Sequence, residues 1–101
     1  MAPGDLAAQM RQALSNVSAL VRAAQGVPGD VVKLTLYVVN YRPDQYPILQ
    51  QAIEEQYGTR QAPALTLVGV ETLPMAGLVV SVDAVAVLRS QFPDRQRLKG
   101  E

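Results

Sequence analysis

The chain has 101 residues, of which nine are Lys or Arg and nine are Asp or Glu, so its formal charge is zero and its isoelectric point is about 6.2. A neutral chain sets up no long-range field toward a phosphate backbone, which argues against nucleic acid as the main partner. Cysteine and histidine are both absent. This excludes disulfides, thiolate chemistry and the commonest general base and metal ligand, and we expect neither a metal nor a cofactor.

The first predicted element is an amphipathic helix that begins after Asp5, whose carboxylate can accept the free backbone N–H groups of the first turn. Apolar residues then recur at three- and four-residue spacings, while polar residues such as Gln9 and Arg22 fall on the other side. The predicted buried face consists of Leu6, Met10, Ala13, Leu14, Val17, Leu20, Val21 and Ala24. Gly26 suits the left-handed position after a last helical turn, so the helix should stop near Gln25.

The next predicted elements are a strand over residues 31–39 and a second helix. One face of the strand is wholly aliphatic, because its apolar residues alternate with Lys33, Thr35 and Tyr37. These apolar residues are Val32, Leu34, Leu36 and Val38. Proline is tolerated in a first turn, so the helix should start between Asp44 and Tyr46, and Gly58 should end it. Its buried side would consist of Tyr46, Leu49, Ile53 and Tyr57.

Two further apolar runs complete the predicted sheet. Residues 64–70 are rich in strand-forming residues and follow Pro63. After a turn over residues 73–77, residues 78–88 are apolar almost throughout, which is typical of a strand covered on both faces and central to the sheet or to an assembly. Residues 89–101 carry many charges and little periodic apolar content, which predicts a solvated tail.

The element order of helix, strand, helix, strand, strand predicts an α+β fold with two helices on one face of a small sheet. Residues 1–88 would form one domain, followed by the charged tail of residues 89–101. The uncovered face would be too apolar for water, so an oligomer should close it. That predicted face includes Thr35, Tyr37, Leu65, Leu67, Val79 and Val85. No signal peptide starts the chain and no segment has the roughly 20 apolar residues that span a bilayer, so we expect a cytoplasmic protein without a membrane partner.

Several short segments follow one another along the chain. They include Gln9-x-Arg11-Gln12-Ala13-Leu14, Gly29-Asp30-Val31-Val32-Lys33, Pro63-Ala64-Leu65-Thr66, Val68-Gly69-Val70, Leu73-Pro74 and Ser81-Val82-Asp83-Ala84-Val85. In their order and spacing, which cover nearly the whole chain up to Leu88, they resemble the reactive intermediate deaminase family (Rid, YjgF-like, also called endoribonuclease L-PSP). Any one of these segments alone would be a weak signal.

The resemblance implies a chorismate-mutase-like fold and a homotrimer whose sheets face a central barrel, with ligand pockets at the three subunit interfaces. In active members, those pockets hydrolyse enamines and imines released by pyridoxal-phosphate enzymes. That chemistry needs an arginine to hold the substrate carboxylate in two hydrogen bonds, and a carboxylate or a held water for proton transfer and attack.

The sequence departs from this family pattern in three places. The arginine of the family's Pro-Ala-Arg-Ser/Thr motif is Leu65, which cannot pair with a carboxylate. The first glutamate of the final-strand motif is Ser81, whereas its second acidic position is kept as Asp83. The family's first strands, with their tyrosine and Ser-Gly segments, have no counterpart before Asp5, so part of the expected pocket wall is missing.

Leu65, Thr66, Ser81 and Asp83 are therefore the candidate ligand-binding residues, and none is assigned a catalytic role. Each has a plainer interpretation. Asp83 could be a buried carboxylate satisfied by neighbouring backbone or by Lys33, and the hydroxyls of Thr66 and Ser81 could be satisfied locally. Arg60 could replace the missing arginine from a shifted position, although a loop arginine is more often solvated.

Three functions remain open at this point. The favoured one is a Rid-like homotrimer that binds an uncharged or apolar small molecule between subunits without the standard deaminase activity. The alternative is an enamine/imine deaminase of the 2-iminobutanoate/2-iminopropanoate type, that is, a hydrolase. Ribonuclease activity or translation inhibition is disfavoured by the neutral charge and the missing histidines.

Overall fold

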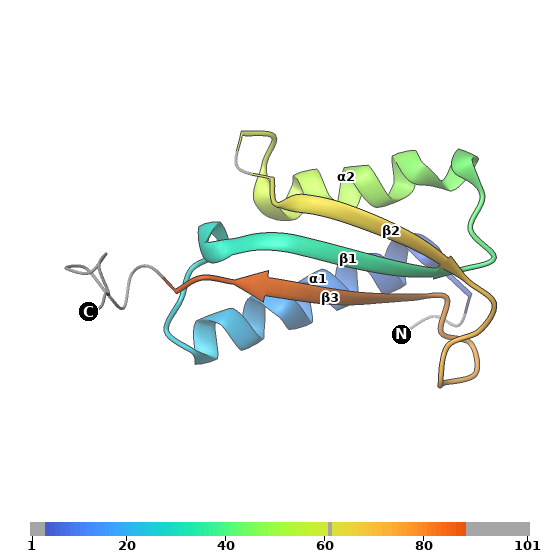
Figure 1. The fold of residues 1–101 in the computed structure, drawn as a ribbon, viewed down its shortest axis with the longest axis horizontal. Coiled ribbons are helices and arrows are strands. Elements are labelled where there is room, and N and C mark those ends of the chain that lie inside the picture. Colours follow the sequence, from blue (N-terminus) through green and yellow to red (C-terminus); the bar gives the residue numbers. More distant parts are fainter. Residues whose placement is uncertain (1–3, 61, 89–101) are drawn as a thin grey trace.

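The computed structural model describes residues 4–60 and 62–88. The predicted order of elements is confirmed: α1 (Leu6–Ala23), β1 (Val31–Val39), α2 (Tyr46–Tyr57), β2 (Ala64–Val70) and β3 (Val80–Ala86). Short 3-10 turns over Pro28–Asp30 and Pro43–Gln45 precede β1 and α2. Both helices lie on the same side of the sheet (Figure 1), so the fold is α+β as expected. The predicted tail of residues 89–101 lies outside the described residues.

The sheet has three strands in the order β2-β1-β3, with β1 parallel to β2 and antiparallel to β3. Among the described residues the central strand is thus β1, so the expectation that residues 78–88 are central to this sheet is wrong, whereas the alternative that they are central to an assembly stays a prediction. β3 is an edge strand, and its residues from Asp83 to Ala86 are exposed. A continuous apolar run indicates that a strand needs cover on both faces, but it does not say whether the same chain supplies that cover.

Helix α1 begins as predicted, with an Asp5 carboxylate oxygen accepting a hydrogen bond from the Ala8 N–H at 3.0 Å. Its buried apolar residues are Leu6, Met10, Leu14, Val17 and Val21. Leu20 is 71% exposed and Ala24 is also exposed, so their predicted burial is wrong. Leu20 lies at the margin of the apolar stripe, where α1 extends past the edge of the sheet. Conversely, the prediction that Gln9 lies on the polar side of the helix is wrong, because Gln9 is only 2% exposed.

The prediction that Gly26 takes the left-handed conformation after the last turn of α1 is wrong. Gln25 takes the left-handed conformation, with φ of 69°, whereas Gly26 does not. Gly26 is needed instead for close packing, since a Cβ atom there would lie 2.5 Å from Leu88 Cδ2 and 2.9 Å from Asp30 Oδ2. The segment after α1 is thereby packed closely against Asp30, which precedes β1, and Leu88, which follows β3.

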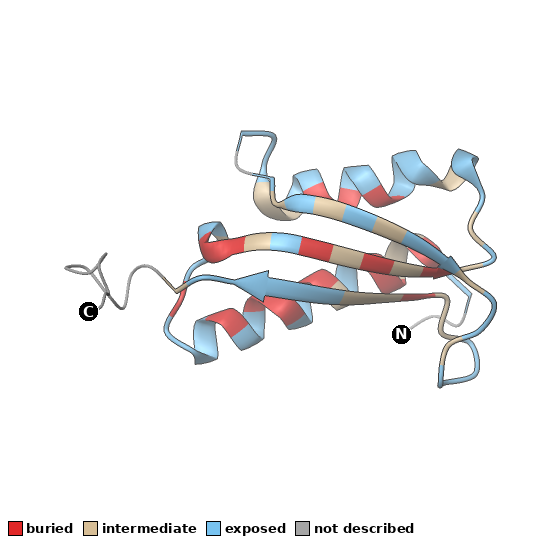
Figure 2. Ribbon diagram, in the orientation of Figure 1, coloured by how far each residue is buried: buried red, intermediate tan, exposed pale blue. Residues whose placement is uncertain are grey.

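The core lies between the two helices and the sheet. β1 contributes Leu34, Leu36 and Val38, each fully buried, and α2 contributes Leu49, Ala52 and Ile53. Figure 2 shows buried and half-buried residues alternating along β1. On α2, the predicted burial of Tyr46 is wrong, because Tyr46 precedes the buried Leu49–Ala52–Ile53 stripe and is 39% exposed.

The strand register decides which residues share the open side of the sheet. Leu34 is paired with Leu65 and Leu36 with Leu67, and paired residues point to the same side. Leu65 and Leu67 therefore lie on the helix side and pack against the core. Their predicted place on the uncovered face is wrong. The open face consists of Lys33, Thr35, Tyr37, Val39, Ala64, Thr66, Val68, Val70, Ser81, Asp83 and Val85.

Candidate functional site

Three of the four predicted site residues meet on the open face. Thr66 of β2 is paired with Thr35 of β1, which is paired in turn with Asp83 of β3. Ser81 lies on the same side of β3, opposite Tyr37. Adjacent strands are about 4.8 Å apart, so the row from Thr66 to Asp83 spans roughly 10 Å. This row offers two threonine hydroxyls and one carboxylate on a flat surface.

The fourth predicted residue, Leu65, is separated from the others by the sheet itself. It is half-buried on the helix side and packs against the core. One chain therefore does not bring Leu65 together with Thr66, Ser81 and Asp83. A site that used both sides of the sheet would need residues from a second copy.

Asp83 is exposed, so the interpretation of it as a buried carboxylate is wrong. Within residues 4–60 and 62–88, the only ion pairs are Arg11–Glu55 and Arg42–Asp44, both on the surface. Lys33, in the next row of the open face, is also exposed and makes no ion pair with Asp83. The open face thus carries one cation and one anion that are not paired with each other.

The remaining candidates have simple surroundings. Thr66 is exposed and Ser81 is half-buried, and neither hydroxyl makes a hydrogen bond to the described part of the chain. Arg60 is exposed in the turn after α2 and takes part in neither of the two ion pairs.

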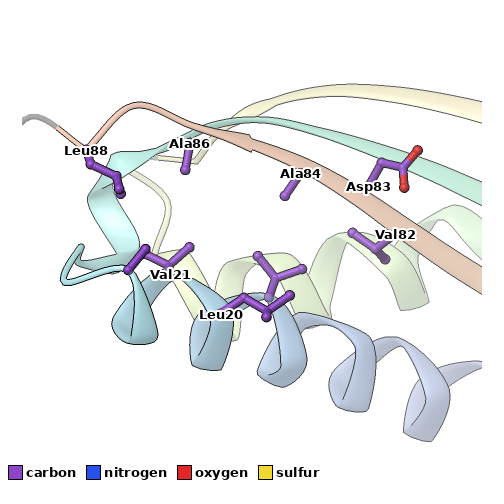
Figure 3. A pocket seen from close by; sticks show the side chains of 9 residues that line it. Leu20, Val21, Val82, Asp83, Ala84, Ala86 and Leu88 are labelled. Carbon is purple, nitrogen blue, oxygen red and sulfur yellow. The ribbon is translucent and has the colours of Figure 1, made fainter.

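A hollow of about 390 Å³ lies between α1 and β3, on the helix side, and was not predicted. We call it the edge groove. It is lined by Val17, Leu20, Val21, Ala24, Val82, Asp83, Ala84, Ala86 and Leu88. In Figure 3 the Asp83 carboxylate points away from Leu20 and Val21, so the side chains that face the groove are apolar. The sequence signal for it is the small size of Ala84 and Ala86, opposite the apolar margin of α1.

The loop of residues 71–79 borders a second hollow, of about 300 Å³. The Gln9 amide fixes this loop: its Nε2 donates to Gly77 O and its Oε1 accepts from Val79 N, each at 2.8 Å. Gly77 O also accepts from Gly4 N at 3.0 Å. The amide is buried because it pairs with backbone groups before β3 that would otherwise lack partners.

Burial raises the pKa of the Tyr57 hydroxyl above its usual value. This hydroxyl is buried without a hydrogen-bond partner among the described residues. Tyr57 lies in the last turn of α2 and packs against the core, on the side of the sheet away from Thr66 and Asp83. A neutral phenol in this place contributes packing rather than proton transfer.

Metal binding and membrane insertion find no support in the described part of the chain. Over residues 4–60 and 62–88, no three His, Cys, Asp or Glu side chains gather closely enough to hold an ion. None of the helices in these ranges has both the length and the apolar character to cross a bilayer.

Comparison with known proteins identifies the family. The family model described as Endoribonuclease L-PSP matches residues 1–88. A 2-iminobutanoate/2-iminopropanoate deaminase of Escherichia coli (strain K12) is 36% identical over 89 residues, covering 86% of this chain and 67% of that protein. A similar deaminase of Salmonella typhimurium is 34% identical over 87 residues, which is 84% of this chain and 66% of that protein.

Solved structures show the same fold. A protein of the conserved Rid family from Yersinia pestis superposes with a TM-score of 0.79 at 34% identity, covering 85% of this chain and 65% of that one. A protein of unknown function from Pseudomonas aeruginosa gives a TM-score of 0.76 at 38% identity, over 83% of this chain and 58% of that one. The chain thus spans about two thirds of the length of these relatives. It belongs to the Endoribonuclease L-PSP (Rid, YjgF-like) family.

Proposed function

We propose that this protein binds a small uncharged or apolar molecule between the subunits of a homotrimer and lacks the standard imine deaminase activity of the family. The observation that carries the proposal is Leu65, which occupies the arginine position of the family motif. Its side chain is half-buried against the core. A hydrocarbon side chain offers no hydrogen bond to a carboxylate, so a carboxylate ligand would lose its main contact.

The distribution of the candidate residues supports a site between subunits. Leu65 lies on the helix side, whereas Thr66, Ser81 and Asp83 lie on the open face. The open face also exposes apolar residues such as Val68 and Val85. A second copy packed on this face would cover that apolar surface and enclose the hydroxyl row. Threonine and serine hydroxyls suit hydrogen bonding to a neutral polar group.

The absence of deaminase activity can be tested by following ammonia release from an imino acid generated in situ. The wild-type protein should not accelerate release above the uncatalysed rate. In Leu65→Arg the guanidinium should restore a measurable acceleration, whereas Leu67→Arg, which places the same charge two residues further along the same side of β2, should not. Catalytic acceleration by the wild-type protein would refute the proposal.

Ligand binding can be tested by thermal denaturation against a panel of uncharged small molecules. A true ligand at 100 times its dissociation constant stabilises the protein by about 2.7 kcal/mol. Thr66→Val, which removes one hydroxyl of the row, should reduce that shift, and Thr72→Val in the loop of residues 71–79 should not. A panel in which no compound raises the melting temperature would count against a binding function.

The alternative function is an enamine/imine deaminase, favoured by the similarity to the Escherichia coli enzyme named for 2-iminobutanoate and 2-iminopropanoate. In that case Asp83 would handle the proton, because it is the acidic side chain of the open face. The wild-type assay above decides between the two functions, and loss of activity in Asp83→Asn would identify the acid.

A further inference from the structure

Strand β3 carries two of the candidate site residues, so its register against β1 decides where they lie. The observed register sets Ser81 opposite Tyr37 and Asp83 opposite Thr35. Alternation along β3 excludes a slip by one residue, which would turn Asp83 toward the helix side. It does not exclude a slip by two residues, because every side chain would then stay on its own side of the sheet.

A slip by two residues would suit the side chains that pair across β1 and β3. It would set Val82 opposite Leu34 instead of Leu36, so apolar residues would still face apolar residues. It would also set Asp83 directly opposite Lys33, and opposite charges in such a cross-strand pair attract each other. In the observed register neither charge forms an ion pair within residues 4–60 and 62–88. The paired side chains therefore do not account for the observed register.

The end of β3 that follows Val85 does not fix the register either. The pairing shifts between Val31 and Lys33, so one extra residue of β1 is taken up there. Beyond this irregularity, Val87 N donates to Asp30 O at 2.8 Å. This hydrogen bond holds the end of the strand, but the irregularity separates it from the row that contains the site residues.

The beginning of β3 is held by Gln9 of α1. The Gln9 Oε1 accepts from Val79 N and its Nε2 donates to Gly77 O, each at 2.8 Å. Val79 O accepts in turn from Val39 N at 2.9 Å, so Val79 is bound by α1 on one side and by the end of β1 on the other. Gln9 is 2% exposed, so water competes little for its hydrogen bonds. The adjacent Met10 is fully buried in the core, so α1 cannot follow a slip of β3.

We propose that Gln9 is a positioning residue that fixes the register of β3 and thereby places Ser81 and Asp83 in the candidate site. A slip by two residues would carry Gly77 and Val79 roughly 7 Å along β1. Both hydrogen bonds of the Gln9 amide would then break, which opposes the slip. The consequence for a ligand rests on the proposed function, whereas the register itself does not.

The register can be measured in solution from nuclear Overhauser effects between Hα protons, which lie close together in the non-hydrogen-bonded pairs of an antiparallel ladder. The wild-type chain should show the contact between Leu36 and Val82. Gln9→Leu should add the contact between Leu34 and Val82, with the slipped register populated at least tenfold more than in the wild type. Gln12→Leu, on the exposed side of α1, should keep the wild-type pattern.

Pairs of introduced cysteines give a second readout, because the chain has no cysteine of its own. Opposite residues of a hydrogen-bonded pair have Cα atoms about 5.5 Å apart, which a disulfide spans, whereas diagonal neighbours are about 7–8 Å apart. With Gln9 present, Ser81→Cys should form a disulfide within one chain at least tenfold faster with Tyr37→Cys than with Thr35→Cys. With Gln9→Leu the two rates should approach each other. A variant that had only lost stability would change both rates alike.

An unchanged pattern of Hα contacts and an unchanged ratio of oxidation rates in folded Gln9→Leu would overturn the inference. Where Gln9→Leu does not fold, the wild-type chain decides. As an anchor, the Val79 amide should exchange with solvent as slowly as the amides of β1. Exchange as fast as that of the exposed Thr72 would overturn the inference. These measurements use neither a ligand nor an activity, so a failure of the proposed function is distinguishable from a failure of this one.

Discussion

The two sides of the sheet are formed by alternate residues of the same strands, but only one side is covered by the helices of the same chain. On the helix side, Leu34, Leu36 and Val38 are fully buried by side chains of the same chain. On the open face, Val68 is 37% exposed and Val85 is 54% exposed, beside hydroxyls and the charges of Lys33 and Asp83, which form no ion pair within residues 4–60 and 62–88. The chain therefore stabilises itself through one side of the sheet and leaves the other side available for binding and assembly.

The largest effect expected from this difference is on stability. Leu36→Ala on the helix side should lower the free energy of unfolding by about 2–5 kcal/mol, because it leaves a cavity in a packed core. Val68→Ala on the open face should change it by about 0.5 kcal/mol or less in the dissociated chain. Urea denaturation at low protein concentration measures both. Equal losses would contradict the distinction between the two sides.

A smaller effect is expected at Gln9, a polar residue of the helix side. Gln9→Leu removes both hydrogen bonds to the loop of residues 71–79 and leaves Val79 N without its acceptor. The cost should be about 1–3 kcal/mol, and exchange of the Val79 amide should become faster. Gln12→Leu, on the exposed side of the same helix, is the matched control and should be close to neutral. A neutral Gln9→Leu would mean that the loop is held by other contacts.

The smallest effect concerns Tyr57 and pH. Its pKa is raised by burial, so the folded state resists deprotonation more than the unfolded state does. The contribution of this group is fully present below the unfolded pKa near 10 and is lost as the pH rises through the folded pKa. Tyr57→Phe should therefore make the alkaline loss of stability shallower. Near neutral pH it should be nearly neutral or slightly stabilising, since the lost hydroxyl has no partner among the described residues.

The elements themselves could be predicted from the sequence, because they depend on local signals. The Asp5 cap, the alternation in residues 31–39 and the glycine after α2 place each helix and strand within a few residues of its observed bounds. The family could also be predicted, because its motifs follow one another in order along the chain.

The sides of the strands could not be predicted in the same way. Alternation shows which residues of β2 share a side, but only the pairing of Leu34 with Leu65 decides that this side meets the helices. The edge position of β3 and the exposure of Leu20 likewise depend on strand order, which no local pattern records. The register places Thr66, Ser81 and Asp83 together on the open face and Leu65 on the helix side, and whether these four residues bind a ligand stays a prediction.

The most direct test of this account is the mass of the wild-type chain in solution, because the open face is proposed to be covered by further copies of the chain. Sedimentation equilibrium at micromolar concentrations should give three times the 10.9 kDa chain mass, as expected for the proposed homotrimer. A stable, folded particle of one chain mass at all concentrations would contradict the account. It would mean that the open side of the sheet is tolerated in water without a partner copy.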